Sequence, residues 1–573
     1  MAFSSESNHV VTSLDASYRR ARIARGWVLS QSVWQERGWG LRDVAPDLAA
    51  SYREAGHWSG RSLGEVVAHG LDLLGHAPFH VRSTIRPWSG TFADVDRAAR
   101  SFASSLSARG VGPGDVVLLQ LPNWVEAGIA FWGATYLGSV VVPVVHFYGA
   151  KEVSHILRVT RPTVVVTPER FGYVDHLANY TSMLSSTPVP NWLVVGDRPT
   201  ASLPAGATAF EDLLDADPIG GPVVVDPASP AVIGFTSGTT QDPKGVVHSH
   251  DTLGFEARQL DWMFPEGGPS AITGAPVGHF IGMLNAFIVP LLRWRPVNLV
   301  DVWDPAAILR LMLDERLGMT GGSTFFLTSL LDHPDFTEEH LGLLPFAGLG
   351  GSPVPEAVTT RARDLGIATF RSYGSTEHPS ITGCRIDEPE DKRMRTDGHA
   401  LPGVEIRLDD DGEILSRGPD LFIGYTDPRL TDATVDSDGW YRTGDIGAVD
   451  DDGYLTITDR VSDVIIRGGE NISAREVEEL VSELGSVAEV SVVAVPDDRM
   501  GERAAAVLLL RPGQKAPTLE TMREHLDGAG LARQKWPESI HVVDEMPRTA
   551  SGKVQKFVLR DRLRAGTLTP PAE

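Results

Sequence analysis

One short stretch of this sequence combines hydroxyl side chains, glycine and lysine directly after an apolar run at 231–235. The stretch reads Thr236-Ser237-Gly238-Thr239-Thr240-Gln241-Asp242-Pro243-Lys244. Such a loop offers backbone N–H groups, short O–H donors and one cation, which are the groups that bind a polyphosphate. It differs from a Walker A loop, which places lysine directly after the second glycine and then Ser or Thr. The pattern therefore predicts a phosphate-binding loop of another kind, with an ordinary surface loop as the alternative.

Three further groups of residues supply the rest of a nucleotide site. The string Tyr373-Gly374-Ser375-Thr376-Glu377 offers an aromatic face for a base, hydroxyls for phosphate oxygen and a carboxylate for magnesium. By itself this string is also common in turns. Asp445 follows a glycine turn and suits a ribose diol, and Arg460 comes soon after it. Lys553 stands on a glycine-containing loop and is one of seven lysines among 51 basic residues, and arginine does not replace lysine where a compact point charge is needed.

The elements that must position these residues alternate between helices and short apolar strands from Trp88 onwards. Helical patterns cover 91–109, 123–137 and 150–158. Apolar strand patterns cover 116–120, 140–145 and 163–167, and strands resume at 299–301, 348–350 and 369–373. Alternation of this kind predicts a parallel sheet that is covered by helices on both faces.

The pattern changes near Gly403. Short strands separated by acidic turns predict an antiparallel sheet or a small barrel at 404–408, 412–416 and 454–458. After Arg460, about 110 residues mix helices and strands and have the size of a separate small domain. We therefore expect an N-terminal extension at 1–60, a large domain at 61–461 and a small C-terminal domain at 462–573. We expect the extension to pack on the large domain, with a basic docking arm as the alternative.

Composition disfavours several classes of protein. The 573 residues carry 75 acidic and 51 basic side chains, and a net charge of −24 disfavours nucleic acid as a partner. With Cys384 as the one cysteine, neither a disulfide framework nor a cysteine zinc site can be built. The first ten residues show no signal peptide, so we expect a cytoplasmic protein. The uncharged run 127–150 could span a membrane, but its glycines and Pro143 indicate a buried helix and strand instead.

Together the motifs resemble the adenylate-forming superfamily of acyl-CoA synthetases, peptide-synthetase adenylation domains and luciferases. The resemblance spans about residues 85–560, with the motifs in the family's order and spacing, and is closest to the acyl-CoA synthetases. It implies an α/β fold with a large N-terminal domain of two β-α subdomains plus a small β-barrel, and a mobile α+β C-terminal domain. It also implies ATP, Mg²⁺ and CoA as cofactors and a small-molecule carboxylic acid as substrate.

The resemblance assigns roles in catalysis and ATP binding by position. Lys553 and Thr376 would contact the α-phosphate, Glu377 would hold magnesium, and His279 would stand at the acyl gate; these are the expected catalytic residues. Tyr373 would lie against the adenine, and Asp445 and Arg460 would bind the ribose. The full set of expected ATP-binding residues is Thr236, Ser237, Gly238, Thr239, Thr240, Lys244, Gly350, Gly351, Ser352, Pro353, Tyr373, Gly374, Ser375, Asp445 and Arg460.

The same resemblance implies where the acid and CoA bind. Gly468 and Gly469 match the turn that lines the pantetheine tunnel after the C-terminal domain has rotated, and Ser462 stands at the hinge. The acyl pocket is expected to be lined by His279, Phe280, Met283, Phe325, Leu349 and Ser372. This set mixes aromatic and small side chains and favours a bulky hydrophobic acid.

Three positions depart from the family pattern. Gln241 replaces a usual glycine in the phosphate loop, and glutamine does not adopt positive φ freely as glycine does. Ser462 replaces a usual Asp or Lys at the hinge, and Ser323 replaces a common proline near the acyl site.

We expect an ATP-dependent carboxylate–CoA ligase that forms acyl-AMP with release of pyrophosphate and then transfers the acyl group to CoA. The alternative is an enzyme specialised for adenylation that passes acyl-AMP to a separate protein or carrier. An amino-acid-activating domain is disfavoured because the stretch 278–282 lacks the Asp that would hold an α-amine. A non-catalytic nucleotide-binding regulator is disfavoured because Glu377 and Lys553 are both present.

Overall fold

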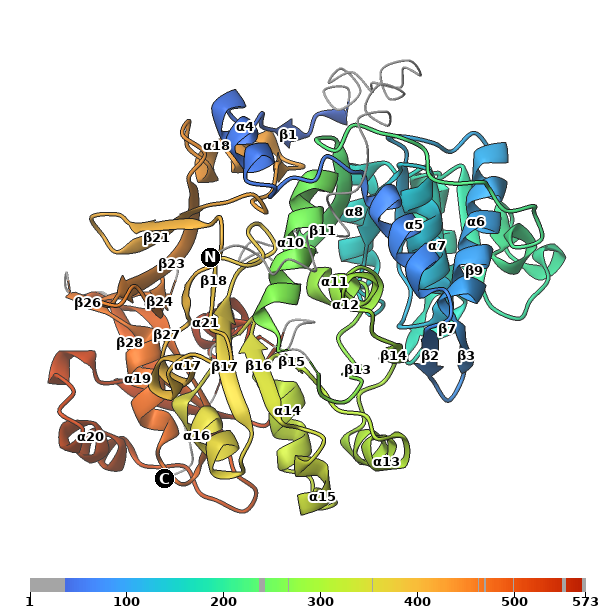
Figure 1. Ribbon diagram of the computed structural model, residues 1–573. Coiled ribbons are helices and arrows are strands. Elements are labelled where there is room, and N and C mark those ends of the chain that lie inside the picture. The colour runs from blue at the N-terminus through green and yellow to red at the C-terminus, as the bar shows by residue number, and fades with distance from the viewer. Residues whose placement is uncertain are drawn as a thin grey trace.

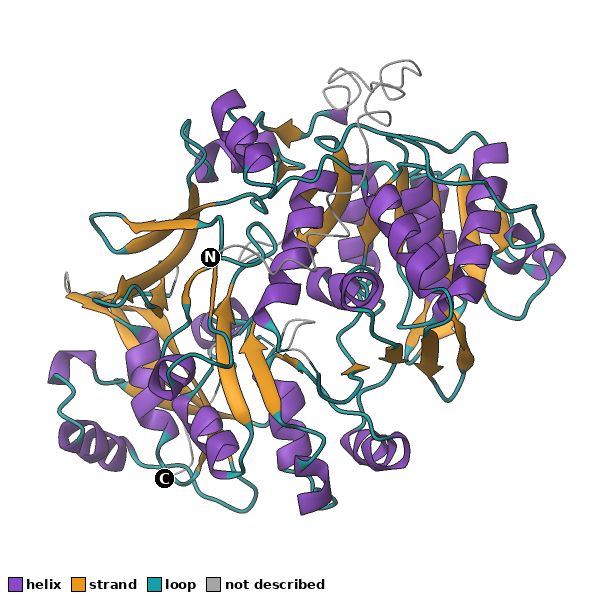
Figure 2. Ribbon diagram, viewed as in Figure 1, coloured by secondary structure: helices purple, strands orange, loops and turns teal. Residues whose placement is uncertain are grey.

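The computed structural model describes residues 37–568, apart from 237–242, 266, 353, 462, 468–469, 498 and 549–552 (Figure 1). Along the chain, two β-α units are followed by an antiparallel sheet and a smaller C-terminal unit. Helices flank the strands of both β-α units and of the C-terminal unit (Figure 2).

The first unit is built on a nine-stranded sheet. Its order is β1 (Gly40–Leu41), β22 (Gly424–Tyr425), β12 (Lys244–Ser249), β11 (Pro230–Thr236), β5 (Val140–Pro143), β4 (Val116–Leu119), β6 (Val164–Pro168), β9 (Asn191–Val195) and β10 (Ala207–Ala209). The strands from β11 to β10 pair in parallel. In contrast, β1, β22, β12 and β11 pair antiparallel, so β12 and β22 extend the parallel core and β1 forms the edge.

Side chains of the central strands alternate between two apolar layers. Val117 and Leu119 pack with α5 (Leu63–Leu74), α6 (Phe92–Ala108) and α7 (Val125–Tyr136). Val116 and Leu118 pack on the opposite face with α8 (Ala150–Thr160) and α9 (His176–Ser186). Because both faces are covered, the strands are continuous apolar runs in the sequence.

The second unit contains a five-stranded sheet, in which the first three strands run parallel. Its order is β15 (Gly321–Gly322), β16 (Phe346–Gly350), β17 (Ala368–Tyr373), β18 (Thr382–Gly383) and β19 (His399–Ala400). A smaller sheet has the order β13 (Ile272–Thr273), β14 (Val297–Val300), β2 (Pro78–Arg82) and β3 (Trp88–Thr91). The helices of this part of the chain are α10 (His250–Met263), α11 (Phe280–Phe287), α12 (Val289–Arg293), α13 (Pro305–Glu315), α14 (Thr324–Leu331), α15 (Glu338–Leu341), α16 (Glu356–Asp364) and α17 (Glu390–Arg395).

The remaining strands belong to the antiparallel sheet and the C-terminal unit. The antiparallel sheet has the order β20 (Glu405–Leu408), β21 (Glu413–Arg417), β23 (Tyr441–Val449) and β24 (Leu455–Arg460), with α18 (Pro428–Thr434) before β23. The C-terminal unit has strands β26 (Glu470–Ile472), β25 (Ile465–Arg467), β28 (Gly501–Leu510), β27 (Val487–Asp497) and β29 (Ser539–Val543), and helices α19 (Ala474–Ser482), α20 (Leu519–Gly528) and α21 (Lys556–Arg564). It contacts the antiparallel sheet where Ser473 Oγ donates to the Thr458 carbonyl at 3.2 Å.

Most elements expected from the sequence are present with small shifts at their ends. The helix expected at 91–109 is α6. A capping box formed by Thr91 and Asp94 stabilises its N-terminus. The uncharged run 127–150 contributes to α7 and β5, both fully buried, as expected. Within the described residues, no helix has both the length and the hydropathy that a membrane crossing needs. The strand expected at 299–301 is β14, which lies in the smaller sheet rather than beside the central strands.

Candidate active site

The phosphate loop begins and ends on two paired strands. Thr236 is the last residue of β11 and Lys244 is the first of β12, and the two lie opposite each other in register. The loop therefore leaves the sheet and returns to it at one point, at the carboxyl end of β11. The residues between these ends, including Ser237, Gly238, Thr239 and Thr240, lie outside the described residues.

Asp445 is the centre of the group expected to bind ribose. The Tyr373 hydroxyl donates to Asp445 Oδ2 at 2.7 Å, and Arg460 Nε lies 2.8 Å from Asp445 Oδ1. Asp445 is 4% exposed, and the two strands β23 and β24 place it opposite Arg460. The negative charge of Asp445 makes the largest contribution to the raised pKa of Arg460. Since each carboxylate oxygen can accept more than one hydrogen bond, ribose hydroxyls remain chemically acceptable partners.

The loop from Tyr373 to His378 presents Thr376 and Glu377. Gly374 allows the turn, because a Cβ there would lie 1.9 Å from the Pro379 carbonyl oxygen. The Tyr425 hydroxyl donates to Glu377 Oε1 at 2.8 Å, and the Phe422 N–H donates to the Glu377 carbonyl at 2.8 Å. Glu377 is therefore held both by its side chain and by its backbone.

Two buried histidines make hydrogen bonds that hold the loop 373–378 in place. His248 Nε2 donates to the Thr376 carbonyl at 2.7 Å, and burial lowers the pKa of His248 to about 4. His378 follows Glu377 directly, and its ring lies 2.8 Å from Ser416 Oγ and 3.3 Å from Asp420 Oδ1. The Ser375 N–H donates to the His378 carbonyl at 3.0 Å, which closes the turn.

The donor chemistry of Glu377 fits magnesium. Among the described residues, no group of three or more His, Cys, Asp or Glu side chains could hold a metal ion. Magnesium does not need such a group, since it keeps several waters and is held by one or two carboxylates together with substrate phosphates. A carboxylate at the edge of a phosphate site is therefore sufficient on the protein side.

Lys553 joins this site from the C-terminal unit. Burial and then the Arg460 charge lower the pKa of the Lys553 ammonium, the charges of Asp445 and Glu377 oppose that decrease, and the net pKa is about 8. Lys553 therefore interacts with the residues that are predicted to bind ribose and magnesium. Burial, and then the charge of Lys553, lower the pKa of His279 to about 4, so the His279 ring also interacts with the Lys553 charge.

The turn after β16 contributes groups to the same edge. Gly351 has φ +73°, a conformation that glycine adopts without strain. A Cβ on Gly350 would lie 2.7 Å from Ser372 Oγ, which explains a second glycine there. The buried Ser352 Oγ has no hydrogen-bond partner among the described residues, so it is a donor that a ligand could satisfy. Pro353 lies outside the described residues.

The residues expected to line the acyl pocket occupy different environments. Phe280 lies beside His248, which contacts Thr376, with its ring centroid 4.8 Å from that of His248. Met283 and Leu349 are fully buried within apolar core clusters. Phe325 is 53% exposed and makes an edge contact with Phe326, which packs in turn on Trp303. The pocket assignment therefore stays a prediction, and so do Ser462, Gly468 and Gly469, which lie outside the described residues.

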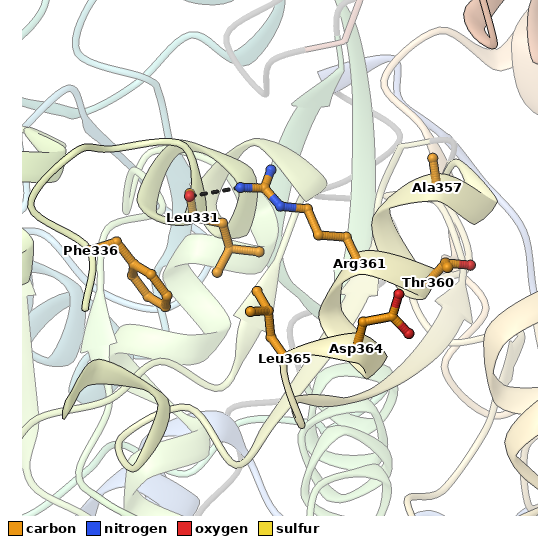
Figure 3. Close-up of a pocket in the computed structure, with 7 residues that line it drawn as sticks. All are labelled: Leu331, Phe336, Ala357, Thr360, Arg361, Asp364 and Leu365. Carbon is orange, nitrogen blue, oxygen red and sulfur yellow. Dashed lines mark hydrogen bonds between the residues drawn. The ribbon is translucent and has the colours of Figure 1, made fainter. Parts of the chain in front are cut away.

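A separate surface pocket has no part in this site. It has a volume of about 490 Å³ and lies at α14 and α16, where Arg361 donates to the Leu331 carbonyl at 2.7 Å (Figure 3). It is lined by Leu331, Phe336, Ala357, Thr360, Arg361, Asp364 and Leu365. None of these residues belongs to the predicted nucleotide or acyl sites.

Sequence motifs did not identify Tyr425, His248 or Phe422 as site residues. Tyr425 and Glu377 are 48 residues apart, and His248 and Thr376 are 128 apart. No local spacing signals such contacts, and only the fold brings them together.

Comparison with known proteins identifies the family of this chain. A family model described as AMP-binding enzyme matches residues 82–426, and a model of the AMP-binding enzyme C-terminal domain matches 476–553. A medium-chain fatty-acid–CoA ligase of Escherichia coli is 32% identical over 89% of this chain and 92% of its own. A methyl-dioxo-octahydroindenyl propanoyl:CoA ligase of Rhodococcus jostii is 35% identical over 82% of this chain and 93% of its own. An amide bond synthetase from Marinactinospora thermotolerans has 26% sequence identity to this chain. Its structure superposes with a TM-score of 0.76 over 87% of this chain and 99% of that one.

Proposed function

The chain belongs to the AMP-binding enzyme family of adenylate-forming enzymes, and from this membership and the site geometry we propose that it is an AMP-forming acid–CoA ligase. CoA ligases of this family use ATP, Mg²⁺ and CoA. In the proposed reaction, a carboxylate attacks the α-phosphorus of ATP, the bond to pyrophosphate breaks, and acyl-AMP forms. The thiol of CoA then attacks the acyl carbonyl and AMP leaves.

The observation that carries this proposal is the position of Lys553. The charges of Arg460, Asp445 and Glu377 all affect the pKa of its ammonium group. A lysine of the C-terminal unit therefore interacts with the candidate site of the large unit. Both reacting anions are negative, and a cation at this point would stabilise the charge that develops on the α-phosphate in the transition state. Alignment of the two anions by the binding residues would supply the rest of the acceleration.

The other residues have roles that follow from their contacts. Asp445, held by Tyr373 and Arg460, would accept hydrogen bonds from the ribose hydroxyls. Thr376 would donate to the α-phosphate, since the His248 contact fixes the backbone of that residue. Magnesium, when bound at Glu377, would neutralise phosphate charge.

We propose a bulky hydrophobic acid as the substrate. Support comes from the aromatic side chains of Phe280 and Phe325 among the predicted pocket residues and from the partial exposure of Phe325. The fused-ring propanoyl group in the name of the Rhodococcus relative is of this kind, as is the medium-chain fatty acid of the Escherichia coli relative.

The second candidate is an enzyme specialised for adenylation. Gln241 and Ser462 depart from the family pattern in the phosphate loop and at the hinge, and an amide bond synthetase is among the similar structures. Such an enzyme would transfer its acyl-AMP to an acceptor other than CoA.

The deciding experiment is a screen of aliphatic, cyclic and aromatic acids. Pyrophosphate exchange into ATP reports acyl-AMP formation, and subsequent addition of CoA reports thioester formation. We expect both with bulky hydrophobic acids. Exchange without any acyl-CoA would favour the second candidate, and no exchange with any acid would contradict both.

A further inference from the structure

We propose that Arg42 is a positioning residue for Glu377, and that the segment 37–60 thereby tunes the affinity of the site for its divalent cation. The proposal rests on the proposed function, in which Glu377 binds magnesium. It concerns a residue that no motif of the nucleotide site contains, located 335 positions before Glu377 in the chain.

Arg42 reaches Glu377 through the backbone of Phe422. The guanidinium donates to the Phe422 carbonyl from Nε at 3.2 Å and from Nη2 at 2.8 Å. The N–H of the same Phe422 donates to the Glu377 carbonyl at 2.8 Å. A shift of Phe422 would therefore move the peptide that carries the carboxylate.

A second route from the same segment reaches the Glu377 side chain. Gly40 in β1 lies opposite Tyr425 in β22. The Thr431 hydroxyl donates to the Gly40 carbonyl at 2.8 Å and accepts from the Tyr425 N–H at 2.8 Å. The Tyr425 hydroxyl then donates to Glu377 Oε1 at 2.8 Å. The backbone and the carboxylate of Glu377 are thus both connected to residues 422–425, the part of the chain that contains the strand paired with β1.

The contact between β1 and its neighbours is tight. A Cβ on Gly40 would lie 2.2 Å from Pro428 Cα, and a Cβ on Gly424 would lie 2.1 Å from the Gly40 carbonyl oxygen. Figure 1 shows β1 beside α4 (Pro46–Glu54) and α18 at one end of the molecule. Further along the segment, Trp58 Nε1 donates to the Pro419 carbonyl at 2.9 Å, three residues before Phe422. Close packing of this kind restricts where the 419–425 backbone can lie.

The positioning of Glu377 by neighbouring residues is especially important if the bound cation is magnesium. Magnesium requires nearly ideal octahedral geometry at short distances. Groups that orient a metal ligand from outside the coordination sphere typically change metal affinity or activity by about 10–100-fold when they are removed. Tyr425 occupies that position relative to Glu377, and Arg42 acts one contact further out, through Phe422.

The test measures metal binding directly as well as turnover. Binding of Mn²⁺ in the presence of ATP and without an acid is followed by electron paramagnetic resonance of the free ion. We expect Arg42→Gln to raise the Mn²⁺ dissociation constant about tenfold and to raise the half-saturating Mg²⁺ concentration in pyrophosphate exchange by a similar factor. Arg42→Lys retains one cationic donor, so we expect it to recover part of the affinity.

The matched control is Arg37→Gln. Arg37 belongs to the same segment, and its guanidinium also donates two hydrogen bonds to backbone carbonyls, those of Thr160 at 2.9 Å and Gly114 at 3.2 Å. Because neither contact leads to Phe422, we expect this variant to change thermal stability without changing the Mn²⁺ dissociation constant. An unchanged constant in Arg42→Gln, or equal shifts in both variants, would overturn the proposal.

Arg42→Lys and one further variant, Thr431→Val, cover the case in which Arg42→Gln does not fold. Thr431→Val removes the hydroxyl between Gly40 and Tyr425, and Arg42→Lys keeps the charge; both should weaken Mn²⁺ binding, and unchanged binding in both would overturn the proposal. A wild-type protein that binds Mn²⁺ and ATP but activates no acid would contradict the proposed function alone. The dissociation constants of the variants would still decide the role of Arg42.

Discussion

At the scale of single residues, Lys553 shows how the environment sets the chemistry. An exposed lysine titrates near 10.4, whereas burial and the Arg460 charge lower the pKa of Lys553 to about 8. In the same site, burial keeps the pKa of His279 near 4, so this ring is neutral at pH 7 and adds no positive charge next to Lys553. The cation on which the proposed first step depends is therefore the lysine that titrates close to physiological pH.

We predict that Lys553→Ala lowers adenylation by about 10²–10³-fold, the range for removing one transition-state charge donor. Thioester formation from preformed acyl-AMP should be spared, because thiol attack does not need this cation. Rapid-quench measurement of each half-reaction checks this. Equal losses in both half-reactions would contradict the separate role of Lys553.

The same residue predicts a pH dependence. The ammonium is the active form and loses its proton as the pH rises through about 8, so kcat/KM for ATP in pyrophosphate exchange should fall above that pH. In Lys553→Arg the guanidinium stays charged at every accessible pH. The decrease in kcat/KM above about pH 8 should therefore disappear in this variant, even if its kcat/KM is lower at every pH. A fall of the same shape in Lys553→Arg would assign it to another group.

Glu377→Gln tests the metal ligand. The change preserves shape and the possibility of a hydrogen bond from Tyr425 but removes the negative charge. Adenylation should decrease and should be partly rescued by high Mg²⁺, because losing a carboxylate weakens a site for a hard cation. Unchanged activity and unchanged Mg²⁺ dependence would show that Glu377 is not the ligand.

At the scale of elements, the site is assembled at strand ends and across paired strands. β11 ends at Thr236 and β17 ends at Tyr373, so both deliver side chains at the carboxyl ends of parallel strands, where α/β sheets commonly bind ligands. The antiparallel pair β23 and β24 brings Asp445 opposite Arg460. Three sheets therefore contribute to one site.

Asp445→Asn tests this cross-strand arrangement. The variant loses the carboxylate that pairs with Arg460 and accepts a hydrogen bond from the Tyr373 hydroxyl. Binding of the ribose should therefore weaken, and KM for ATP should rise about tenfold or more. Tyr373→Phe keeps the aromatic face and removes only the hydroxyl, so it should have a smaller effect. A KM for ATP that is unchanged in Asp445→Asn would exclude Asp445 as a ribose ligand.

At the scale of the whole molecule, the structure places the C-terminal unit with Lys553 in the site. The Arg475 guanidinium donates to the Ile457 carbonyl, and Ser473 donates to the Thr458 carbonyl, so β24 and the start of α19 hold the two parts together. This arrangement suits acyl-AMP formation. The family resemblance implies that a rotation would then remove Lys553 and insert the glycine turn at 468–469.

We predict that Gly469→Leu leaves pyrophosphate exchange near normal and blocks CoA-dependent turnover, because its side chain would fill the proposed pantetheine passage. Ser462→Pro fixes φ near −65° at the proposed hinge and should impair one half-reaction more than the other. Parallel assays of exchange and of acyl-CoA formation check both variants. If Gly469→Leu supports full CoA turnover, the passage lies elsewhere.

The sequence alone predicted the chemistry of the candidate site and the order of its parts along the chain. Each motif consists of residues close in the chain, and their types, such as the Thr376-Glu377 pair or Lys553 beside glycine, predict function because hydroxyl, carboxylate and ammonium groups have fixed donor and acceptor properties. The strands β11 and β17, which precede two of the motifs, were predicted as well, whereas β23, which carries Asp445, was not. Helix and strand ends shifted by only a few residues.

Only the tertiary structure decided which distant groups support the site. Arg42 and Phe422 are 380 residues apart, and Tyr425 reaches Glu377 from a strand that no motif contains. It also placed Met283 and Leu349 in the core and left Phe325 exposed, although all three are apolar residues in the expected pocket. The physical reason is that hydrogen bonds and burial depend on distances in space, and local spacing along the chain carries no information about contacts between segments that are hundreds of residues apart.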